Sequence, residues 1–175
     1  MRTLTKTEFD NILELHKKWL TGEDDGVKAD LSNTDLNDAN LHFADLRYAD
    51  LRGADLRGAN LSYADLSDAD LSDADLRGAN LSDASLNWIN WHEAKGIKVY
   101  VAGLQSSREN AQLTYIPSLG LAITGCWQNN WTNTKKRIHG EYAKGTRERK
   151  AYDVAIKYIE DQVKLALEDE VKTDA

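Results

Sequence analysis

The chain has 175 residues, of which 41% are hydrophobic and 29% charged, and its formal net charge is −7. This balance excludes wholesale disorder, and no apolar run approaches the ~18 residues that would predict a membrane-spanning helix. The single cysteine, Cys126, excludes an internal disulfide and fits a reducing compartment. Because the N-terminal stretch carries no signal-peptide pattern, we expect a cytoplasmic protein.

Residues 1–28 predict a capping helix followed by a lead-in to the next segment. Thr5 and Glu8 have the spacing of a capping box, and Gly22 can end the helix. Between them lies an apolar stripe at helical spacing, made up of Phe9, Ile12, Leu13, Leu15, Trp19 and Leu20. His16 has no metal-like partner nearby, and we interpret it as a surface residue.

Residues 29–93 repeat with a period of five. Leucine occupies every fifth position from Leu31 to Leu86, with Trp91 in the next slot, and Ala stands two positions earlier in nearly every unit. A helix turns by about 100° per residue, so this period moves each Leu off any fixed stripe. A flat strand fails too, because an odd spacing alternates faces. The pattern fits a chain that turns a corner every five residues.

Four such corners close a square coil, and successive coils stack at the strand spacing of ~4.8 Å. We write i for the repeat Leu. Positions i and i−2 point inward, where the small residue fits the crowded corner, while i−1, i+1 and i+2 point outward. The sides are numbered by their i residues: side one has Leu31, Leu51, Leu71 and Trp91, side two has Leu36, Leu56 and Leu76, side three has Leu41, Leu61 and Leu81, and side four has Leu46, Leu66 and Leu86.

The pattern A-(D/N)-L-x-x over residues 29–93 resembles the pentapeptide-repeat family. This resemblance implies a right-handed quadrilateral β-helix, here with about three coils, so the expected fold is mainly β. A stacked coil needs its open ends covered, and we expect residues 1–28 to cover the first of them. Some members of the family resemble DNA and bind DNA gyrase, which gives a precedent for a protein partner.

The outward positions carry most of the acidic charge. Residues 29–93 hold twelve Asp and one Glu against four Arg, a net charge of −9. Asp and Asn at i−1 can hydrogen-bond their own turns, and we interpret them as structural. Position i+2 has no evident turn role, so its acids and aromatics are the candidate partner-binding residues: Asp38, Asp68, Asp73, Asp83, Tyr48, Tyr63 and Trp88, with Phe43 as a further outward aromatic. The alternative is that flanking segments cover the aromatic rings.

Residues 94–175 predict a small α+β module with a net charge of +3. We expect one strand over 97–104 and two more within 111–127, turned at 117–120. The module therefore begins with antiparallel strands and continues with helices.

The first of these helices is expected within residues 130–142, capped by Asn130 or Thr132. A long helix over 145–170 follows, with Thr146 as a plausible N-cap. The order of capping helix, repeat block and α+β module resembles proteins encoded in bacteriophage and prophage genomes. That resemblance implies the cytoplasm of a bacterial host cell as the location.

No pattern in the sequence indicates catalysis. The four histidines lack metal-ligand spacing with one another or with cysteine, and neither a P-loop nor a GxGxxG motif after a strand is present. Cys126 lies in an apolar context, and we interpret it as a buried core residue rather than a nucleophile. We therefore expect no enzyme, no catalytic residue, no bound metal and no cofactor.

A basic segment near two tryptophans is the candidate phosphate- or anion-binding site. It comprises Lys135, Lys136, Arg137, Arg147, Arg149 and Lys150. Basic charge beside aromatic rings suits phosphates or nucleotides, and a solvated helix face is the alternative. The acidic repeat surface would repel a duplex, so direct binding of duplex DNA is not expected.

Three functions fit these features. The first, which we favour, is a non-enzymatic phage-type binding protein that inhibits a host DNA-binding enzyme or a defence factor through an acidic surface that mimics nucleic acid. The second is a structural or assembly protein that uses the coil as a spacer and forms a homo-oligomer through the helix over 145–170. The third is sequestration of a phosphorylated small ligand by the basic segment. None of the three involves a membrane.

Overall fold

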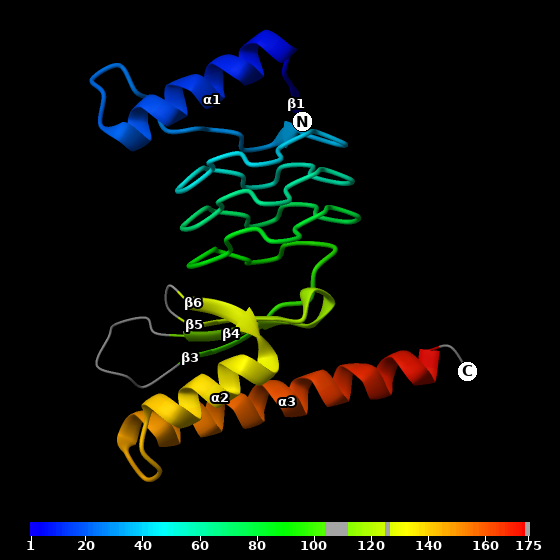
Figure 1. Cartoon of the computed structure of the whole chain (residues 1–175). Coiled ribbons are helices and arrows are strands. Elements are labelled where there is room, and N and C mark those ends of the chain that lie inside the picture. Colours follow the sequence, from blue (N-terminus) through cyan, green and yellow to red (C-terminus); the bar gives the residue numbers. More distant parts are fainter. Residues whose placement is uncertain (104–111, 125–126, 174–175) are drawn as a thin grey trace. The chain divides into compact units, whose positions relative to one another are not determined.

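The computed structural model describes residues 1–103, 112–124 and 127–173, and Cys126 therefore lies outside the described residues. The chain divides into two compact units, Met1–Ile97 and Lys98–Ala175. Figure 1 shows the helix α1 and the stacked coil of the first unit, and the sheet and two helices of the second. In the described part of the chain, no helix combines the length and the apolar character needed to cross a membrane.

The first unit begins with a short strand and the predicted capping helix. Strand β1 (Arg2–Thr3) pairs in parallel with strand β2 (Thr34–Asp35) of the first coil. Helix α1 (Lys6–Thr21) begins at the capping box, because Thr5 accepts a hydrogen bond from Glu8 N and Glu8 accepts one from Thr5 N. The helix ends at Gly22, which adopts the left-handed conformation with φ 77°.

His16 on α1 is fully buried, so its prediction as a surface residue is wrong. The Nδ1 atom accepts a hydrogen bond of 3.1 Å from the backbone N–H of Ala29, and the ring stacks on Trp19 with 5.8 Å between centroids. Position 16 falls within the apolar stripe of α1, which turns the ring towards the first coil. Burial lowers the pKa of His16 and favours the neutral ring that this hydrogen bond requires.

Each turn of the coil takes twenty residues. Isolated parallel bridges join residues twenty apart at position i−1, beginning with Asp30 and Asp50. Backbone hydrogen bonds run both ways across a bridge: Leu31 N donates to Asp50 O at 2.8 Å, and Asp50 N donates to Ala29 O at 3.0 Å. Beyond β2, the repeat region therefore consists of bridges and turns rather than of longer strands.

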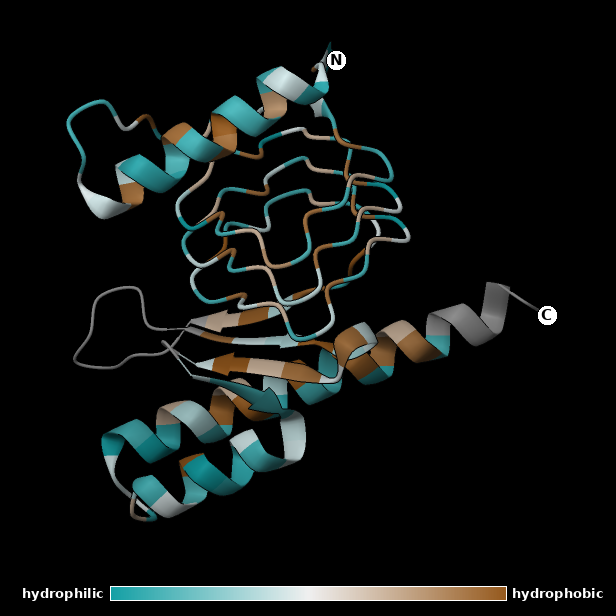
Figure 2. Ribbon diagram, turned by 45° about the horizontal axis from the view of Figure 1, so that its top comes forward, coloured by the Kyte–Doolittle hydropathy of each residue, from teal (hydrophilic) through white to brown (hydrophobic). Residues whose placement is uncertain are grey.

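The predicted interior of the coil is confirmed. The repeat leucines from Leu31 to Leu86 are at most 5% exposed, and inward alanines such as Ala59 and Ala69 are at most 1% exposed. Burial of one such leucine stabilises the fold by about 1.5–3 kcal/mol. Figure 2 shows the result as hydrophilic and hydrophobic residues that alternate along every turn of the coil.

Position i+2 adopts the left-handed conformation in every repeat from Asn33 to Glu93, with φ between 50° and 75°. Gly, Asn and Asp adopt this conformation most readily. The prediction that Asp at i+2 has no turn role is therefore wrong, because the corner itself favours Asp there. Periodicity had shown that this position faces outward, but not which backbone conformation it takes.

The second unit contains a four-stranded antiparallel sheet in the order β3-β4-β5-β6. Its strands are β3 (Tyr100–Gly103), β4 (Gln112–Ile116), β5 (Leu121–Thr124) and β6 (Trp127–Asn130). The predicted turn between β4 and β5 is a 3-10 helix η1 (Pro117–Leu119) closed by Gly120. Strand β6 was not predicted, because the sequence WQNN lacks an alternation of apolar and polar residues.

Helices α2 (Trp131–Glu141) and α3 (Arg147–Thr173) complete the second unit. Asn130 caps α2 by accepting a hydrogen bond from Asn133 N at 2.9 Å, and Thr146 accepts one from Arg149 N at 3.2 Å at the start of α3. The helices and the sheet share one core, which comprises Ala102, Leu113, Ile138, Ala155, Ile156 and Ile159. In this unit the predicted helices are confirmed and the core lies between sheet and helices.

Candidate functional site

The outward acids at i−1 are held by their own turns. Asp75 Oδ1 accepts a hydrogen bond from the backbone N–H of Arg77 at 3.2 Å, and Asp30 accepts one from Ser32 N at 3.1 Å in the same way. The pattern recurs along the coil wherever Asp or Asn occupies i−1, including Asn90 with His92 N. These residues close corners, as predicted from their residue type.

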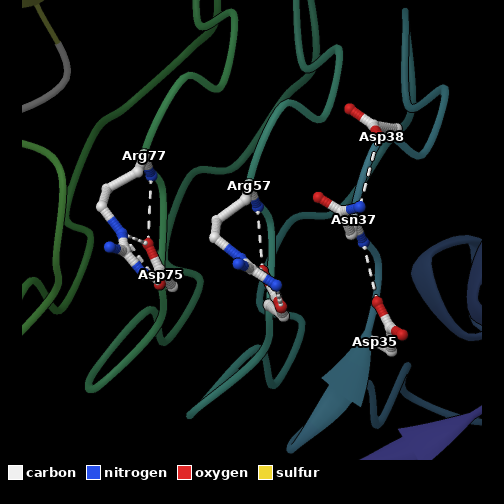
Figure 3. A network of polar contacts seen from close by, with 7 residues as sticks. Asp35, Asn37, Asp38, Arg57, Asp75 and Arg77 are labelled. Atoms are coloured by element: carbon white, nitrogen blue, oxygen red, sulfur yellow. Dashed lines mark hydrogen bonds and ion pairs between the residues drawn. The ribbon is translucent and has the colours of Figure 1, made fainter.

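Arginine at i+1 folds back onto the Asp two residues before it. Arg57 Nε donates to Asp55 Oδ1 at 2.7 Å, and Arg77 Nε donates to Asp75 Oδ1 at 2.9 Å. Figure 3 shows Arg77 lying over Asp75 in this way. The same pairing joins Arg47 to Asp45 and Arg52 to Asp50. All four arginines of the coil therefore neutralise acids of the coil itself.

These pairs keep the carboxylates ionised. Hydrogen bonds from Arg77 lower the pKa of Asp75 to about 2, and hydrogen bonds from Arg57 lower the pKa of Asp55. In the first repeat of side two, Asn37 stands where arginine stands in the later ones, and its Nδ2 donates to Asp38 at 3.2 Å (Figure 3). The acidic charge of side two is thus largely committed to contacts within the coil.

The candidate acids at i+2 are exposed, as predicted, but the coil does not gather them. Asp38 lies on side two, Asp68 on side four, Asp73 on side one and Asp83 on side three. None of the four forms an ion pair with another described residue of the chain. A single acidic patch made of these carboxylates is therefore absent from the described structure.

The aromatic residues at i+2, in contrast, are gathered on two adjacent sides. Phe43 and Tyr63 lie on side three, Tyr48 and Trp88 lie on side four, and all four are exposed. Each adopts a φ of 58° to 64°, which costs a bulky residue roughly 1–2 kcal/mol. The turn gains nothing from a ring at this position, so the backbone alone does not explain these residues.

Side three carries a column of three rings. Phe43 stacks on Tyr63 with centroids 5.1 Å apart and planes 28° apart. His42 packs against both, with centroids 4.1 Å from Phe43 and 5.6 Å from Tyr63. The His42 Nδ1 atom lies 2.9 Å from the carbonyl oxygen of Ser62, which fixes the ring in place. The carboxylate of Asp83 raises the pKa of Tyr63, and Asp83 occupies the left-handed position one coil on from Tyr63, at the foot of the column.

Side four is partly covered by α1. Trp19 meets Tyr48 edge to face, with 6.0 Å between centroids, so a flanking segment covers this ring as the alternative prediction required. Trp88 lies two coils further along the same side and remains exposed. Among the described residues of the first unit, the rings of side three have no such cover from α1.

Two residues of this surface were not singled out from the sequence as site residues. His42 lacks metal-ligand spacing, but its place directly before the outward Phe43 is a signal in the sequence that it could join an aromatic cluster. Trp19 was assigned to the apolar stripe of α1, and its contact with Tyr48 depends on how the helix crosses the coil, which no local pattern shows.

Ion pairs within the second unit involve three of the six cations of the basic segment and leave the other three without a described ion pair. Lys135 pairs with Glu160 at 2.7 Å and lies 5.3 Å from the ring of Trp131. Arg137 pairs with Glu141 at 2.7 Å and lies 4.7 Å from the Trp127 ring, and Arg149 pairs with Asp153 at 2.9 Å. Lys136, Arg147 and Lys150 form no ion pair with a described residue. Anion binding by these three cations stays a prediction.

No group of three or more His, Cys, Asp or Glu side chains that could hold a metal ion occurs among the described residues. The exposed side chains of the coil include aromatic rings, carboxylates, amides, hydroxyls and the guanidinium groups that pair with carboxylates of the coil. Such a set can bind by stacking, by hydrogen bonding and by ion pairing with a cation.

Comparison with known proteins identifies the repeat. The family model of pentapeptide repeats matches residues 27–62 and 54–90. Rfr23 from the cyanobacterium Cyanothece 51142 is 38% identical over a match that covers 39% of this chain and 44% of that chain, with a TM-score of 0.28. The protein alr5209 from Nostoc PCC 7120 is 42% identical, covering 46% and 71%, with a TM-score of 0.25.

A third solved structure is QnrB1, a plasmid-mediated fluoroquinolone resistance protein, at 25% identity over 38% of this chain and 36% of that chain, with a TM-score of 0.28. The chain thus spans less than half of the length of Rfr23 and about a third of QnrB1. No curated protein matches the chain. The family match covers the segment in which parallel bridges join residues twenty apart, as expected for a coil of four five-residue sides.

Proposed function

Because residues 27–90 of this chain are pentapeptide repeats and belong to that family, we propose that the protein is a non-enzymatic binding protein whose coil contacts a protein partner. The contact surface is the outward face of sides three and four. The proposal includes a location in the cytoplasm of a bacterial cell.

One observation carries this proposal. Four exposed aromatic rings occupy left-handed positions that Gly, Asn and Asp fill elsewhere in the same coil. Phe43 and Tyr63 stay 68% and 52% exposed in the free protein, so the cost of roughly 1–2 kcal/mol that each carries at such a position is explained by burial against a partner. Exposed aromatic residues are also the type most enriched at protein interfaces.

Affinity capture from bacterial lysate, with identification of the bound proteins by mass spectrometry, tests the proposal. The variant is Phe43→Asn with Tyr63→Asn, since Asn tolerates the left-handed conformation. The matched control is Leu167→Gln, because Leu167 is 57% exposed and Tyr63 is 52% exposed, yet Leu167 lies on α3. We expect the double variant to lose the captured protein and the control to keep it. Equal capture by all three proteins would contradict the proposal.

The narrower form of this proposal is phage-type inhibition of a host DNA-binding enzyme or a defence factor by an acidic, nucleic-acid-like surface. The exposed, unpaired carboxylates of Asp68, Asp73 and Asp83 support it. The arginine pairs of the coil weaken it, because they neutralise acids that mimicry would use. Changing all four i+2 acids to Asn in the same capture experiment decides this form: a mimic loses its partner, and unchanged capture excludes mimicry.

A second candidate function is assembly through the second unit. Val154, Tyr158 and Leu165 are exposed on α3 at spacings of four and seven residues, which places them on one stripe of the helix. Such a stripe fits self-association, with the coil as a spacer. Light scattering at several protein concentrations tests this function: a mass that rises with concentration supports it, and a strict monomer excludes it.

A further inference from the structure

The column on side three has a composition that selects its partner. We define the aromatic column as His42, Phe43 and Tyr63, with Asp83 at its foot. Phe43 remains 68% exposed in spite of its contacts with His42 and Tyr63, so aromatic surface is open to a partner. Asp83 is exposed one coil below Tyr63, a distance of ~5 Å along the coil.

Asp83 is open to a partner, because it is exposed and forms no ion pair with a described residue. An ionised carboxylate offers about four lone-pair sites, so Asp83 can accept hydrogen bonds from a donor that a partner brings. The column therefore presents ring faces and a carboxylate with spare acceptor capacity, side by side on one outward face.

The surroundings of the column are poor in positive charge. On sides three and four, the only Lys or Arg at the outward repeat positions is Arg47, and this residue is paired with Asp45 at 2.7 Å. The remaining outward residues on side three are Ser62, Ser82 and Asn side chains at i−1. A cation that approaches side three meets no unpaired basic residue of the coil.

We infer that the aromatic column receives an arginine side chain from a basic segment of the protein partner. This inference rests on the proposed function and names the chemistry of its partner. A guanidinium is planar and can stack on an aromatic face while its N–H groups reach a carboxylate. Lysine cannot stack in this way, and a nucleotide or duplex would bring phosphates to a coil of net charge −9.

Titration calorimetry of the full chain tests the inference, with a short synthetic peptide of alternating arginine and serine as the probe. The comparison peptide replaces each arginine by lysine, which keeps the charge and removes the planar group. We expect the lysine peptide to bind about fivefold to tenfold more weakly, and Phe43→Asn to weaken the arginine peptide by about tenfold.

A matched pair of charge variants separates the column from the general acidity of the coil. Asp83→Asn and Asp38→Asn remove the same charge at equivalent left-handed positions, one on side three and one on side two. We expect Asp83→Asn to weaken the arginine peptide several-fold and Asp38→Asn to leave it within about twofold. Equal affinity for the two peptides, equal effects of the two variants, or binding of AMP instead of the peptide would each overturn the inference.

The inference and the proposed function can fail separately. Suppose that the Phe43→Asn, Tyr63→Asn variant loses its captured partner, but the arginine peptide neither binds the native protein nor displaces that partner. The surface then binds a group other than arginine, and the arginine inference is wrong. If capture is unaffected by that variant, the proposed function itself is wrong.

Discussion

Sides one and two of the coil share their backbone with sides three and four but differ in what fills the left-handed position. On sides one and two this position holds Gly, Asn and acidic residues: Asn33, Gly53, Asp73, Glu93, Asp38, Gly58 and Gly78. On sides three and four it holds four aromatic residues and only two aspartates. The comparison separates residues that the corner favours from residues that it merely tolerates, and the tolerated ones mark the surface that we assign to a partner.

The largest expected effect on stability tests whether the buried leucines of different sides contribute equally to the free energy of unfolding. Leu56 on side two and Leu61 on side three are both fully buried. Leu56→Ala and Leu61→Ala should each lower the free energy of unfolding by about 2–5 kcal/mol, because each leaves a cavity in the same column of leucines. Urea denaturation followed by circular dichroism measures both. A much smaller loss on side three would show that the two pairs of sides also differ in their interior.

A smaller effect tests the cost of the left-handed position on side two. A Cβ added at Gly78 would have no neighbouring atom closer than 3.7 Å, so the backbone conformation is the main penalty there. Gly78→Ala should lower the free energy of unfolding by about 1–2 kcal/mol, and Gly78→Asn should recover part of this loss. Equal stability of the native protein and Gly78→Ala would show that the left-handed position carries no conformational penalty, and the comparison of the sides depends on that penalty.

The arginine pairs of side two predict a dependence on acidic pH. Since hydrogen bonds from Arg77 lower the pKa of Asp75 to about 2 in the folded state, the folded protein binds fewer protons than the unfolded chain below pH ~4. The stabilisation is fully present above pH ~4 and is lost as the pH falls towards about 2. Arg77→Ser, which gives side two the residue found in several other repeats, should flatten the fall of the urea midpoint in this range. An unchanged pH profile would contradict a stabilising role for the pair.

The smallest effect on stability is expected on side three. Phe43→Asn relieves a strain of about 1–2 kcal/mol but removes a ring contact worth about 0.5–1.5 kcal/mol, so the free energy of unfolding should change by less than about 1 kcal/mol. The same substitution is expected to weaken binding of the arginine peptide by about tenfold. Thermal unfolding measures the first quantity, and a loss above ~2 kcal/mol would show that Phe43 serves the fold rather than a partner.

The sequence predicted the coil because its constraint is periodic. Each corner needs an inward Leu with a small Ala beside it, so both residues recur every five positions in the sequence. The capping box of α1 is a local motif, and it was predicted as well. The left-handed φ at i+2 was missed, although Gly53, Gly58 and Gly78 stand at this position, because inward and outward directions follow from spacing while backbone dihedrals do not. The burial of His16 was missed for a different reason, since it depends on how α1 crosses the first coil.

The gathering of the candidate site could be predicted only in part. Outward orientation of Tyr63 and Asp83 followed from the repeat, and stacking by twenty placed them on one side. That the ring of His42 would join Phe43 and Tyr63 follows from side-chain packing across two coils. In the basic segment, Arg137 and Arg149 pair with acids four residues further along their own helices, a spacing that the sequence shows. The pair of Lys135 with Glu160 depends on α2 and α3 lying together.

The first coil of the stack is covered by the N-terminal segment, because strand β1 pairs with it. Backbone N–H and C=O groups at the end of a coil form a template on which another coil could grow. Here Arg2 N donates to the carbonyl oxygen of Asn33 at 2.7 Å, and His16 of α1 accepts from Ala29 N, so the chain's own first residues occupy bonding groups of that template. The N-terminal segment thus acts as a built-in end cap. A second copy of the protein cannot stack end to end on the first coil, because β1 and α1 already occupy these backbone groups.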